Sequence, residues 1–343
     1  MARCLQLAAL GLGRVAPNPL VGAVLVAEDR IIGEGFHAFF GGPHAEINCL
    51  ASVSEKDRHL IAQATMYVSL EPCAHWGKTP PCSNAIIQAK IPHVVVAIQD
   101  PFAAVNGAGI AQLIDAGIKV EVNVLSEQAA FLNRRFITRQ QLHRPYIILK
   151  WAESADGFIG SGTNERWMIS SVIAQQMVHK WRAEEDAIFI GTNTALLDNP
   201  SLTNRSWGEK QPQRWVLDMH HRLLPTLQVF DKKAETVVFT SKLNSALPSH
   251  IKQVEIGDNS NVLEDVMDWG FHAGIGSVLV EGGSILLDAC LNRNLFDELR
   301  VITSKENAPV KNGVKAPELP VNLICRETLD LGSDLLKIYN KAI

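Results

Sequence analysis

A histidine, a glutamate and two cysteines constrain the fold of this chain more than any other feature. His44 and Glu46 stand one residue apart, and the apolar run at 47–51 predicts a helix that begins at this pair. Cys73 and Cys82 each follow a proline further along the chain. A fold that joins these four side chains must bring two helix starts to the end of a strand.

The residue types predict a zinc site with one open position. His44, Cys73 and Cys82 offer one nitrogen and two sulfur ligands, one fewer than a closed structural zinc site uses. Zinc deaminases leave the fourth position to water, and a carboxylate that is not a ligand carries the proton. We therefore expect Glu46 to be the catalytic acid and base.

Length and charge favour two domains and a small-molecule substrate. A chain of 343 residues is long for a single core. Its 32 lysines and arginines against 36 acidic residues give a net charge of −4, a poor match to a nucleic-acid backbone. We expect no nucleic-acid partner.

The cysteines and the hydropathy pattern predict a soluble protein of the cytoplasm. Free cysteine is among the most buried residue types, so we assign Cys4, Cys49, Cys290 and Cys325 to the core rather than to disulfides. No stretch approaches the roughly eighteen consecutive apolar residues of a membrane span, and the N-terminus lacks a signal-peptide pattern. We expect no membrane association.

The order of the predicted elements indicates two α/β domains. Strand patterns in the first half lie at 23–26, 66–70, 93–98 and 119–122, between helical patterns at 2–12, 83–90 and 110–116. A polar helical pattern spans 126–142 and ends before Arg144-Pro145, where we place the boundary between domains 1–143 and 146–343. Short β-branched runs at 146–150, 187–191, 214–218, 236–240 and 277–281 predict buried parallel strands.

The motifs around these residues closely resemble those of the bifunctional riboflavin-biosynthesis deaminase–reductase family. The first half carries Asn18-Pro19, Val21-Gly22, Gly35-x-His37, Pro43-His44-Ala45-Glu46 and Leu70-Glu71-Pro72-Cys73-Ala74-His75-x-Gly77-Lys78-Thr79-Pro80-Pro81-Cys82. The second half carries Lys150-x-Ala152-x-Ser154-x-Asp156-Gly157, Trp181-Arg182-Ala183, Asp186-Ala187-Ile188, Gly191-x-x-Thr194-x-x-x-Asp198-x-Pro200-x-Leu202-x-x-Arg205 and Val280-Glu281-Gly282-Gly283. The resemblance covers nearly the whole chain. In one departure, Trp167 stands one place before the tryptophan of the family, which aligns with Met168.

The resemblance implies a fold and a pair of reactions. The first domain is expected to be a cytidine-deaminase-like α/β/α layer with Zn²⁺, and the second a dihydrofolate-reductase-like, mostly parallel α/β domain with NADPH. The first would deaminate 2,5-diamino-6-ribosylamino-4(3H)-pyrimidinone 5′-phosphate by hydrolysis. The second would reduce the ribosyl group, giving 5-amino-6-(5-phosphoribitylamino)uracil. A homo-oligomer, dimer or tetramer, is also expected.

The resemblance also implies which residues bind the ligands. In the first domain, the substrate contacts would come from Asn18, His37, His75 and Lys78, with Lys78 facing the phosphate. In the second, the substrate side would hold Lys150, Arg182, Leu202, Arg205 and Glu281. The NADPH side would hold Ala152, Thr194, Asp198, Gly283, Ser284, Ile285, Leu286, Leu287, Asp288 and Ala289.

Three other interpretations can be weighed. A nucleic-acid base deaminase would need a basic, aromatic surface that the composition does not favour. A zinc-stabilised scaffold would need a fourth ligand, which His37 or His75 could supply, but it has no use for Glu46. A deaminase with a weak or inactive reductase domain is the nearest alternative.

Overall fold

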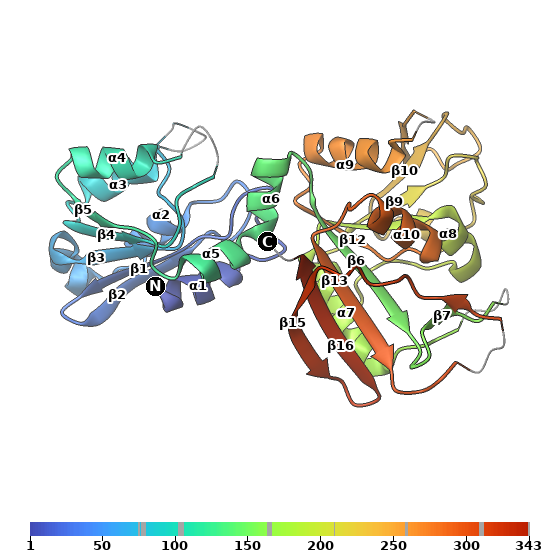
Figure 1. The fold of residues 1–343 in the computed structure, drawn as a ribbon. Coiled ribbons are helices and arrows are strands. Elements are labelled where there is room, and N and C mark those ends of the chain that lie inside the picture. The colour runs from blue at the N-terminus through green and yellow to red at the C-terminus, as the bar shows by residue number, and fades with distance from the viewer. Residues whose placement is uncertain are drawn as a thin grey trace. The chain divides into compact units, whose positions relative to one another are not determined.

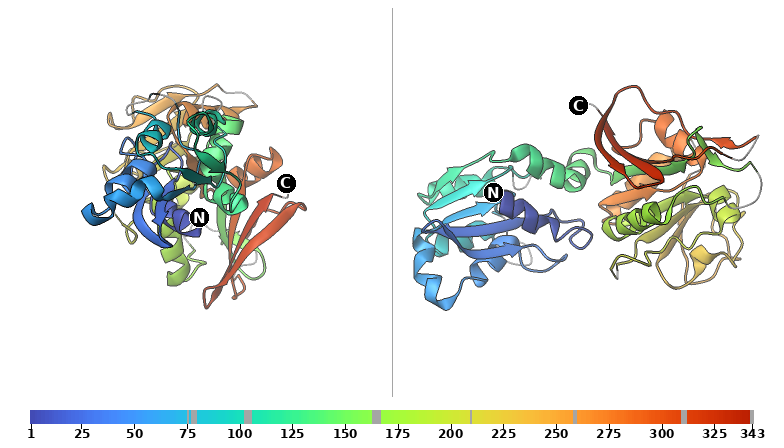
Figure 2. Two further views of the ribbon diagram at one scale, coloured as in Figure 1. Left: turned by 90° about the vertical axis from the view of Figure 1, so that its left-hand side faces the viewer. Right: turned by 90° about the horizontal axis from the view of Figure 1, so that it is seen from below.

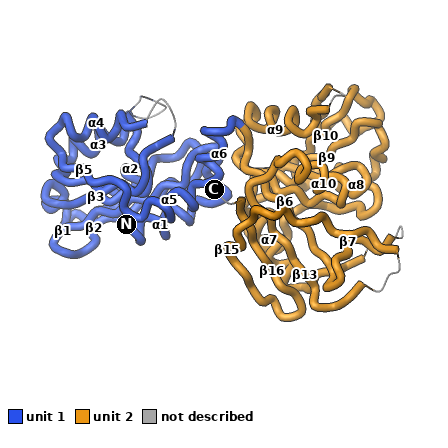
Figure 3. Tube along the Cα trace, in the orientation of Figure 1, with its two compact units in different colours: residues 1–143 blue, residues 144–343 orange. Residues whose placement is uncertain are grey.

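The computed structural model describes residues 1–74, 76, 80–101, 106–162, 167–208, 210–257, 260–308 and 312–341. The chain divides into two compact units, residues 1–143 and 144–343, each with its own sheet and core (Figure 3). None of the helices in the described part of the chain combines the length and apolar character that a membrane crossing requires.

Unit 1 contains a mixed sheet. Its described strands, in spatial order, are β2 (Arg30–Phe36), β1 (Gly22–Ala27), β3 (Thr65–Val68), β4 (His93–Val96) and β5 (Lys119–Glu121). Strand β1 is antiparallel to both neighbours, whereas β3, β4 and β5 are parallel to one another. The 3₁₀ helix η1 (Glu55–Gln63) precedes β3.

Alternate side chains of the sheet in unit 1 face two helical layers. The helices are α1 (Ala2–Ala9), α2 (Ala45–Ala51), α3 (Cys82–Gln88), α4 (Ala108–Asp115), α5 (Ser126–Leu132) and α6 (Arg134–Leu142). Leu25 packs with Cys49 of α2, Ile86 of α3 and Leu113 of α4, whereas Val24 packs with Cys4 of α1 (Figure 1). Because successive strand residues point to opposite faces, the sheet separates two layers. The predicted α/β/α arrangement is confirmed.

The helical pattern predicted over 126–142 forms two helices, α5 and α6, which meet at Asn133. The Asn133 side chain is buried; its Nδ2 donates to the carbonyl oxygen of Leu20 over 2.9 Å, and its Oδ1 accepts from the N–H of Leu20 over 2.8 Å. A side chain that hydrogen-bonds to backbone far away in the sequence does not change the local hydrophobic periodicity, so the pattern cannot show such a break. The break ties both helices to the loop that carries Asn18.

Unit 2 contains a larger and mostly parallel sheet. Its described strands, in spatial order, are β11 (Lys252–Glu255), β10 (Thr236–Thr240), β9 (Gln213–Leu217), β8 (Ala187–Gly191), β12 (Ser277–Val280), β6 (Tyr146–Glu153), β13 (Glu298–Ser304), β16 (Asp334–Lys341) and β15 (Leu323–Asp330). The strands from β11 to β13 are parallel; β6, β8, β9, β10 and β12 among them were predicted, whereas β11 and β13 were not. The antiparallel β16 and β15 (red in Figure 2) form an edge that the periodicity did not predict. A separate pair joins β7 (Phe158–Gly160) to β14 (Val314–Lys315).

Among the described residues of unit 2, four helices cover the two faces of this sheet. They are α7 (Val172–Glu184), α8 (Thr192–Asp198), α9 (Val262–His272) and α10 (Ser284–Asn292), with the short η2 (Gln228–Phe230) beside them. Phe189 and Trp215 pack under α9 and α10, whereas Ile148 packs with Trp181 of α7 on the opposite face. This second layered core confirms the predicted α/β class of unit 2. In this arrangement the start of α10 and one face of α7 lie at the strand ends.

The assignment of the remaining cysteines to the core is wrong at one position. Cys4, Cys49 and Cys290 are buried, but Cys325 is exposed. Cys325 lies on β15, the outermost strand of its sheet, where most side chains remain exposed. A single cysteine carries no sign in the sequence of whether its strand lies at the centre or the edge.

Candidate active sites

The predicted zinc ligands meet in unit 1. His44 caps the start of α2, Cys82 is the first residue of α3, and Cys73 follows β3. His44 Nδ1 lies 3.2 Å from Cys82 Sγ and 3.6 Å from Cys73 Sγ, and all three ligand atoms lie within 4.8 Å of one another. One nitrogen and two sulfur donors at this spacing fit a zinc ion with an open position.

The pKa values of the two cysteine ligands are shifted in opposite directions. The pKa of Cys73 is lowered to about 4, chiefly by a hydrogen bond from the Cys82 thiol, and the backbone N–H of Cys82 also donates to Cys73 Sγ over 3.3 Å. The same thiol hydrogen bond raises the pKa of Cys82. Cys73 is therefore held as a thiolate, the form that binds zinc.

Glu46 lies beside the ligands without belonging to them. It occupies the first turn of α2, is only 3% exposed, and lines the same pocket as His44 and Cys73. Burial is the main cause that raises the pKa of Glu46 to about 7. A carboxyl group with such a pKa can both accept and return a proton near neutral pH.

His37 orients the amide of Asn18 in this pocket. His37 Nδ1 lies 3.0 Å from the carbonyl oxygen of Pro43, and its Nε2 lies 3.1 Å from Asn18 Nδ2. Because a carbonyl only accepts, Nδ1 carries the proton and Nε2 accepts from the amide. Burial lowers the pKa of His37 and keeps the ring neutral. With both ring nitrogens engaged, His37 is not a fourth ligand, and the Oδ1 of Asn18 is left to face a ligand.

Glu71 holds the segment next to Cys73 in place. Its buried carboxylate accepts hydrogen bonds from the backbone N–H groups of Asp100, Gly107, Gly109 and Ile110, over 3.1, 2.9, 2.9 and 3.2 Å. A methyl group at Gly109 would lie 1.9 Å from the carbonyl oxygen of Pro72, so only glycine fits there. Glu71 thus joins the strand end that carries Cys73 to the start of α4.

The cavity of unit 1 has a volume of about 270 Å³ and includes residues that the sequence did not predict. Its further lining residues are Pro17, Pro19, Val21, Ala45, Leu70, Glu71, Asp100, Phe136, Arg139 and Gln140. The last three belong to α6, which no motif linked to the zinc ligands. His75 and Lys78, both predicted to bind substrate, lie outside the described residues.

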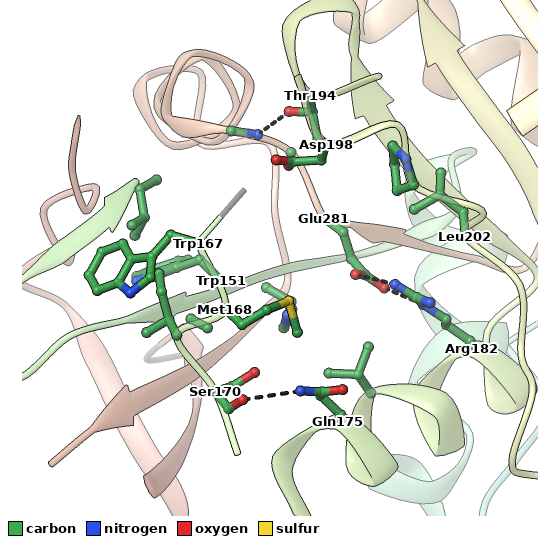
Figure 4. Close-up of a pocket in the computed structure, with 18 of the residues that line it drawn as sticks. Trp151, Trp167, Met168, Ser170, Gln175, Arg182, Thr194, Asp198, Leu202 and Glu281 are labelled. Atoms are coloured by element: carbon green, nitrogen blue, oxygen red, sulfur yellow. Dashed lines mark hydrogen bonds and ion pairs between the residues drawn. The ribbon is translucent and has the colours of Figure 1, made fainter. Parts of the chain in front are cut away.

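A second cavity of about 270 Å³ lies in unit 2 (Figure 4). It is lined by nine residues predicted for substrate or NADPH: Lys150, Ala152, Arg182, Thr194, Asp198, Leu202, Arg205, Glu281 and Gly283. They come from β6, α7, α8, the segment after α8, and the turn after β12. The parallel sheet brings them together because its strand ends and helix starts meet at one edge.

Two of the residues predicted for the substrate side of this cavity form an ion pair. Arg182 and Glu281 form two parallel hydrogen bonds of 2.9 and 2.8 Å, and Arg182 Nη1 donates to the carbonyl oxygen of Thr203 over 3.2 Å (Figure 4). Burial lowers the pKa of Lys150, while the nearby Glu281 opposes this shift. Arg182 and Glu281 neutralise each other, and the two basic groups that remain, Lys150 and Arg205, outnumber the one further acid, Asp198.

The predicted NADPH run is only partly at the cavity. Thr194 Oγ1 accepts from the N–H of Gly283 over 2.9 Å, which joins α8 to the glycine turn (Figure 4). The next six residues belong to α10 and do not line the cavity. Leu286 and Leu287 are core residues, whereas Ile285 is exposed.

Several residues of this cavity were missed from the sequence. They are Trp151, Ile159, Trp167, Met168, Ile169, Ser170, Gln175, Val178, His179, Pro200 and Gly282. Trp167 and Met168 both line it, so the shifted motif still supplies a tryptophan (Figure 4). Four of the lining residues lie on one face of α7, at positions 175, 178, 179 and 182, a helical spacing that points to a shared surface once Arg182 is identified.

His179 contacts the predicted substrate residue Arg205 twice. Its Nδ1 lies 3.3 Å from the backbone N–H nitrogen of Arg205, and its Nε2 lies 3.4 Å from Arg205 Nη2. Burial, followed by the charges of Arg182 and Arg205, lowers the pKa of His179. The ring is therefore neutral at pH 7, and its Nδ1 can accept the hydrogen bond from the Arg205 N–H while Nε2 carries the proton.

Comparisons with known proteins match both units of the chain. Residues 145–304 match the family described as RibD C-terminal domain, and residues 1–98 match the cytidine and deoxycytidylate deaminase zinc-binding region. The riboflavin biosynthesis protein RibD of Aquifex aeolicus is 36% identical over 99% of this chain and 97% of its own length. The RibD of Synechocystis is 37% identical over 100% of this chain and 92% of its own length.

Solved structures extend this likeness to the whole fold. A crystal structure from Thermotoga maritima, described as a diaminohydroxyphosphoribosylaminopyrimidine deaminase/5-amino-6-(5-phosphoribosylamino)uracil reductase, is 34% identical with a TM-score of 0.92, over 100% of this chain and 97% of that chain. Acinetobacter baumannii RibD is 32% identical with a TM-score of 0.87, over 100% and 98%. With its paired zinc-deaminase and reductase units, the chain belongs to the RibD family of bifunctional deaminase–reductases of riboflavin biosynthesis.

Proposed function

We propose that this chain acts twice on one phosphorylated pyrimidine. Residues 1–143 hydrolyse the 2-amino group of 2,5-diamino-6-ribosylamino-4(3H)-pyrimidinone 5′-phosphate. Residues 146–343 then use NADPH to give 5-amino-6-(5-phosphoribitylamino)uracil. The observation that carries the proposal is that the described residues of each unit form a cavity, the first lined by His44, Cys73 and a buried carboxyl, and the second lined by lysine, arginine and a glycine turn.

In the deaminase unit, His44, Cys73 and Cys82 hold zinc. Zinc in such a site supplies a nucleophile at neutral pH by acidifying water. Glu46 would take a proton from the attacking water and deliver it to the leaving amino group, as the raised pKa of its carboxyl allows. The water oxygen forms a C–O bond to the ring carbon as the C–N bond breaks, its second proton goes to the ring nitrogen, and a carbonyl and ammonia result. Asn18, oriented by His37, accepts from a donor of the pyrimidine through Oδ1.

In the reductase unit, the protein positions two ligands. NADPH supplies the hydride that reduces C1′ of the sugar. The cofactor contacts come from Ala152, Thr194, Asp198 and the turn at Gly283. Helix α10 begins directly after this turn. Lys150, Arg182, Leu202, Arg205 and Glu281 hold the phosphorylated sugar, whose charge matches the cationic cluster.

The same proposal includes a cytoplasmic location and a homo-oligomer, either a dimer or a tetramer. The balanced charge of the chain suits a freely diffusing enzyme of small molecules. Analytical ultracentrifugation of the purified protein would give the number of chains per particle. A purely monomeric particle would contradict this part of the proposal.

The two half-reactions should be measured separately on the full chain. Ammonia release from the diamino substrate reports on the first unit, and NADPH oxidation with the deaminated compound reports on the second. We expect both activities. Ammonia release without NADPH oxidation would favour the alternative of a deaminase with an inactive reductase domain, and failure of both would overturn the proposal.

A further inference from the structure

A buried asparagine organises the loop that carries Arg205 in the reductase unit. Asn204 stands directly before Arg205, is 3% exposed, and does not itself line the cavity. Its side-chain Oδ1 accepts hydrogen bonds from the backbone N–H groups of Ser206 and Trp207, over 3.2 and 3.0 Å. Its Nδ2 lies within hydrogen-bond distance of three carbonyl oxygens, those of Trp207, Gly208 and Lys210. One amide group thus joins the described residues of this loop, 204–208 and 210, to one another.

Gln211 holds the backbone of the same asparagine. The N–H of Asn204 donates to Gln211 Oε1 over 2.8 Å, and Gln211 Nε2 donates to the carbonyl oxygen of Asn204 over 2.7 Å. The start of the loop is therefore tied to the residue at its end, and both the side chain and the backbone of Asn204 are engaged within the loop. A backbone that is already ordered in this way loses little further freedom when a ligand binds.

The loop is also fastened to α7, one face of which lines the cavity. The N–H of Arg205 donates to His179 Nδ1 over 3.3 Å, and Lys210 Nζ lies 2.9 Å from Asp186 Oδ1, two residues after the end of α7. The guanidinium of Arg205 has a further contact, since its Nη1 donates to Ser201 Oγ over 2.6 Å. Because the backbone is held on both sides of Arg205, the side chain extends from a fixed point at the cavity.

We propose that Asn204 is a positioning residue of the reductase, which sets the affinity for the phosphorylated sugar by holding Arg205 at the cavity. The inference rests on the proposed function, which gives Arg205 a contact with that sugar. Asn204 acts through Arg205, because Asn204 is buried and does not line the cavity. Without the Asn204 amide, the substrate would have to order the loop as it binds, and this would weaken binding. The loss should therefore appear in KM and not in kcat.

The test is a double-mutant cycle on the full chain, measured by NADPH oxidation with the deaminated substrate. For Asn204→Ala, we expect KM to rise about threefold to tenfold, the range that loss of a neutral hydrogen bond gives, with kcat near wild type. In an Arg205→Ala background the same substitution should raise KM no further, because the contact through which it acts is already lost. A purely structural role would give the same loss in both backgrounds, and that result would overturn the proposal.

The matched control is Asn244→Ala, in another loop of unit 2. Asn244 makes the same kind of turn: its Oδ1 accepts from the N–H of Ala246 over 3.0 Å, and the side chain of Gln253 pairs with its backbone over 2.7 and 3.0 Å. Asn244 does not line the cavity, so the reductase constants should stay near wild type. An equal rise of KM in this control would indicate general loosening of unit 2 and would overturn the role of Asn204.

The affinity for NADPH, followed by titration, reports whether unit 2 of each variant is folded and should be unchanged in Asn204→Ala. If that variant does not fold, Gln211→Ala takes its place, with the same expected rise of KM and the same dependence on Arg205. An unchanged KM in the folded variant would overturn the role of Asn204. A wild-type chain that oxidises no NADPH with this substrate would instead overturn the proposed function.

Discussion

The deaminase pocket and the reductase pocket have similar volumes, about 270 Å³ each, but they are built from different kinds of residues. In the deaminase, the bond-breaking chemistry depends on a ligand group whose atoms lie within 4.8 Å of one another and on the neighbouring Glu46. In the reductase, the predicted residues come from five separate segments, and the strongest contact, Arg182 with Glu281, joins two protein groups.

The difference follows from the two reactions. Hydrolysis needs a proton to be moved at a defined atom, so a few buried groups carry most of the effect. Hydride transfer needs two large ligands to be aligned, so many contacts each carry a part. Single substitutions should therefore have larger effects in unit 1 than in unit 2, and four measurements can contradict or refine this comparison.

The largest effect is expected from Cys82→Ser. Loss of one ligand from a three-ligand group should release the zinc, bound at one equivalent per chain in the wild type, and should lower the melting temperature, since the ligands join three elements. Deamination should fall by more than the roughly 10²–10⁴-fold that general acid–base help contributes. Metal analysis and ammonia release measure this. Undiminished zinc with intact deamination would rule out the ligand assignment.

Glu46→Gln should rank second. The amide keeps the size of the side chain but cannot carry the proton, so deamination should fall by roughly 10²–10⁴-fold. Zinc content should not change, because Glu46 is outside the ligand group. NADPH oxidation with the deaminated substrate serves as the control. If both activities fell together, the division of labour between the units would be wrong.

Arg205→Ala should have a moderate effect confined to the reductase. Loss of a charge-assisted contact to the phosphorylated sugar should lower kcat/KM about tenfold to a hundredfold. The affinity for NADPH, measured by fluorescence titration, should stay near wild type, because the proposal gives the cofactor contacts to Thr194 and Gly283, which hydrogen-bond each other, and not to Arg205. A large loss of NADPH affinity with unchanged substrate dependence would move Arg205 to the cofactor.

The smallest effect is expected from His179→Gln and concerns pH. The pKa of His179 lies below its usual 6.5 because of burial, Arg182 and Arg205, while Glu281 opposes the shift. As pH falls through this lowered pKa, the ring gains a proton, loses its acceptor for the Arg205 N–H, and repels the guanidinium. Reductase kcat/KM should therefore decline below pH 6.5.

Glutamine at position 179 keeps an acceptor but cannot gain a proton. The variant should lose only a few-fold in kcat/KM at neutral pH and should show a flatter acid side of the reductase profile. The deamination profile of the same variant is the internal control. If kcat/KM of the variant fell at acidic pH as steeply as that of the wild type, protonation of His179 would not be the cause of the decline.

Local patterns were sufficient where chemistry depends on short segments. The spacing of His44 and Glu46, and the prolines before Cys73 and Cys82, were enough to indicate a metal site, because each group lies at the end of one element. Runs of β-branched residues likewise predicted the parallel strands of unit 2, since strands buried on both faces are apolar throughout. The family followed from the same motifs.

Long-range placement was decided only by the tertiary structure. The break at Asn133 exists because its amide bonds Leu20, which lies 113 residues earlier, and that bond sets α6 against the deaminase pocket. Arg139 and His179 gain their surroundings in the same way, from segments remote in sequence. The sequence by itself determined five central strands of unit 2, the zinc chemistry and the family, because these depend on local spacing and residue type. The partners of buried polar groups depend on packing between distant segments, and no local pattern carries that information.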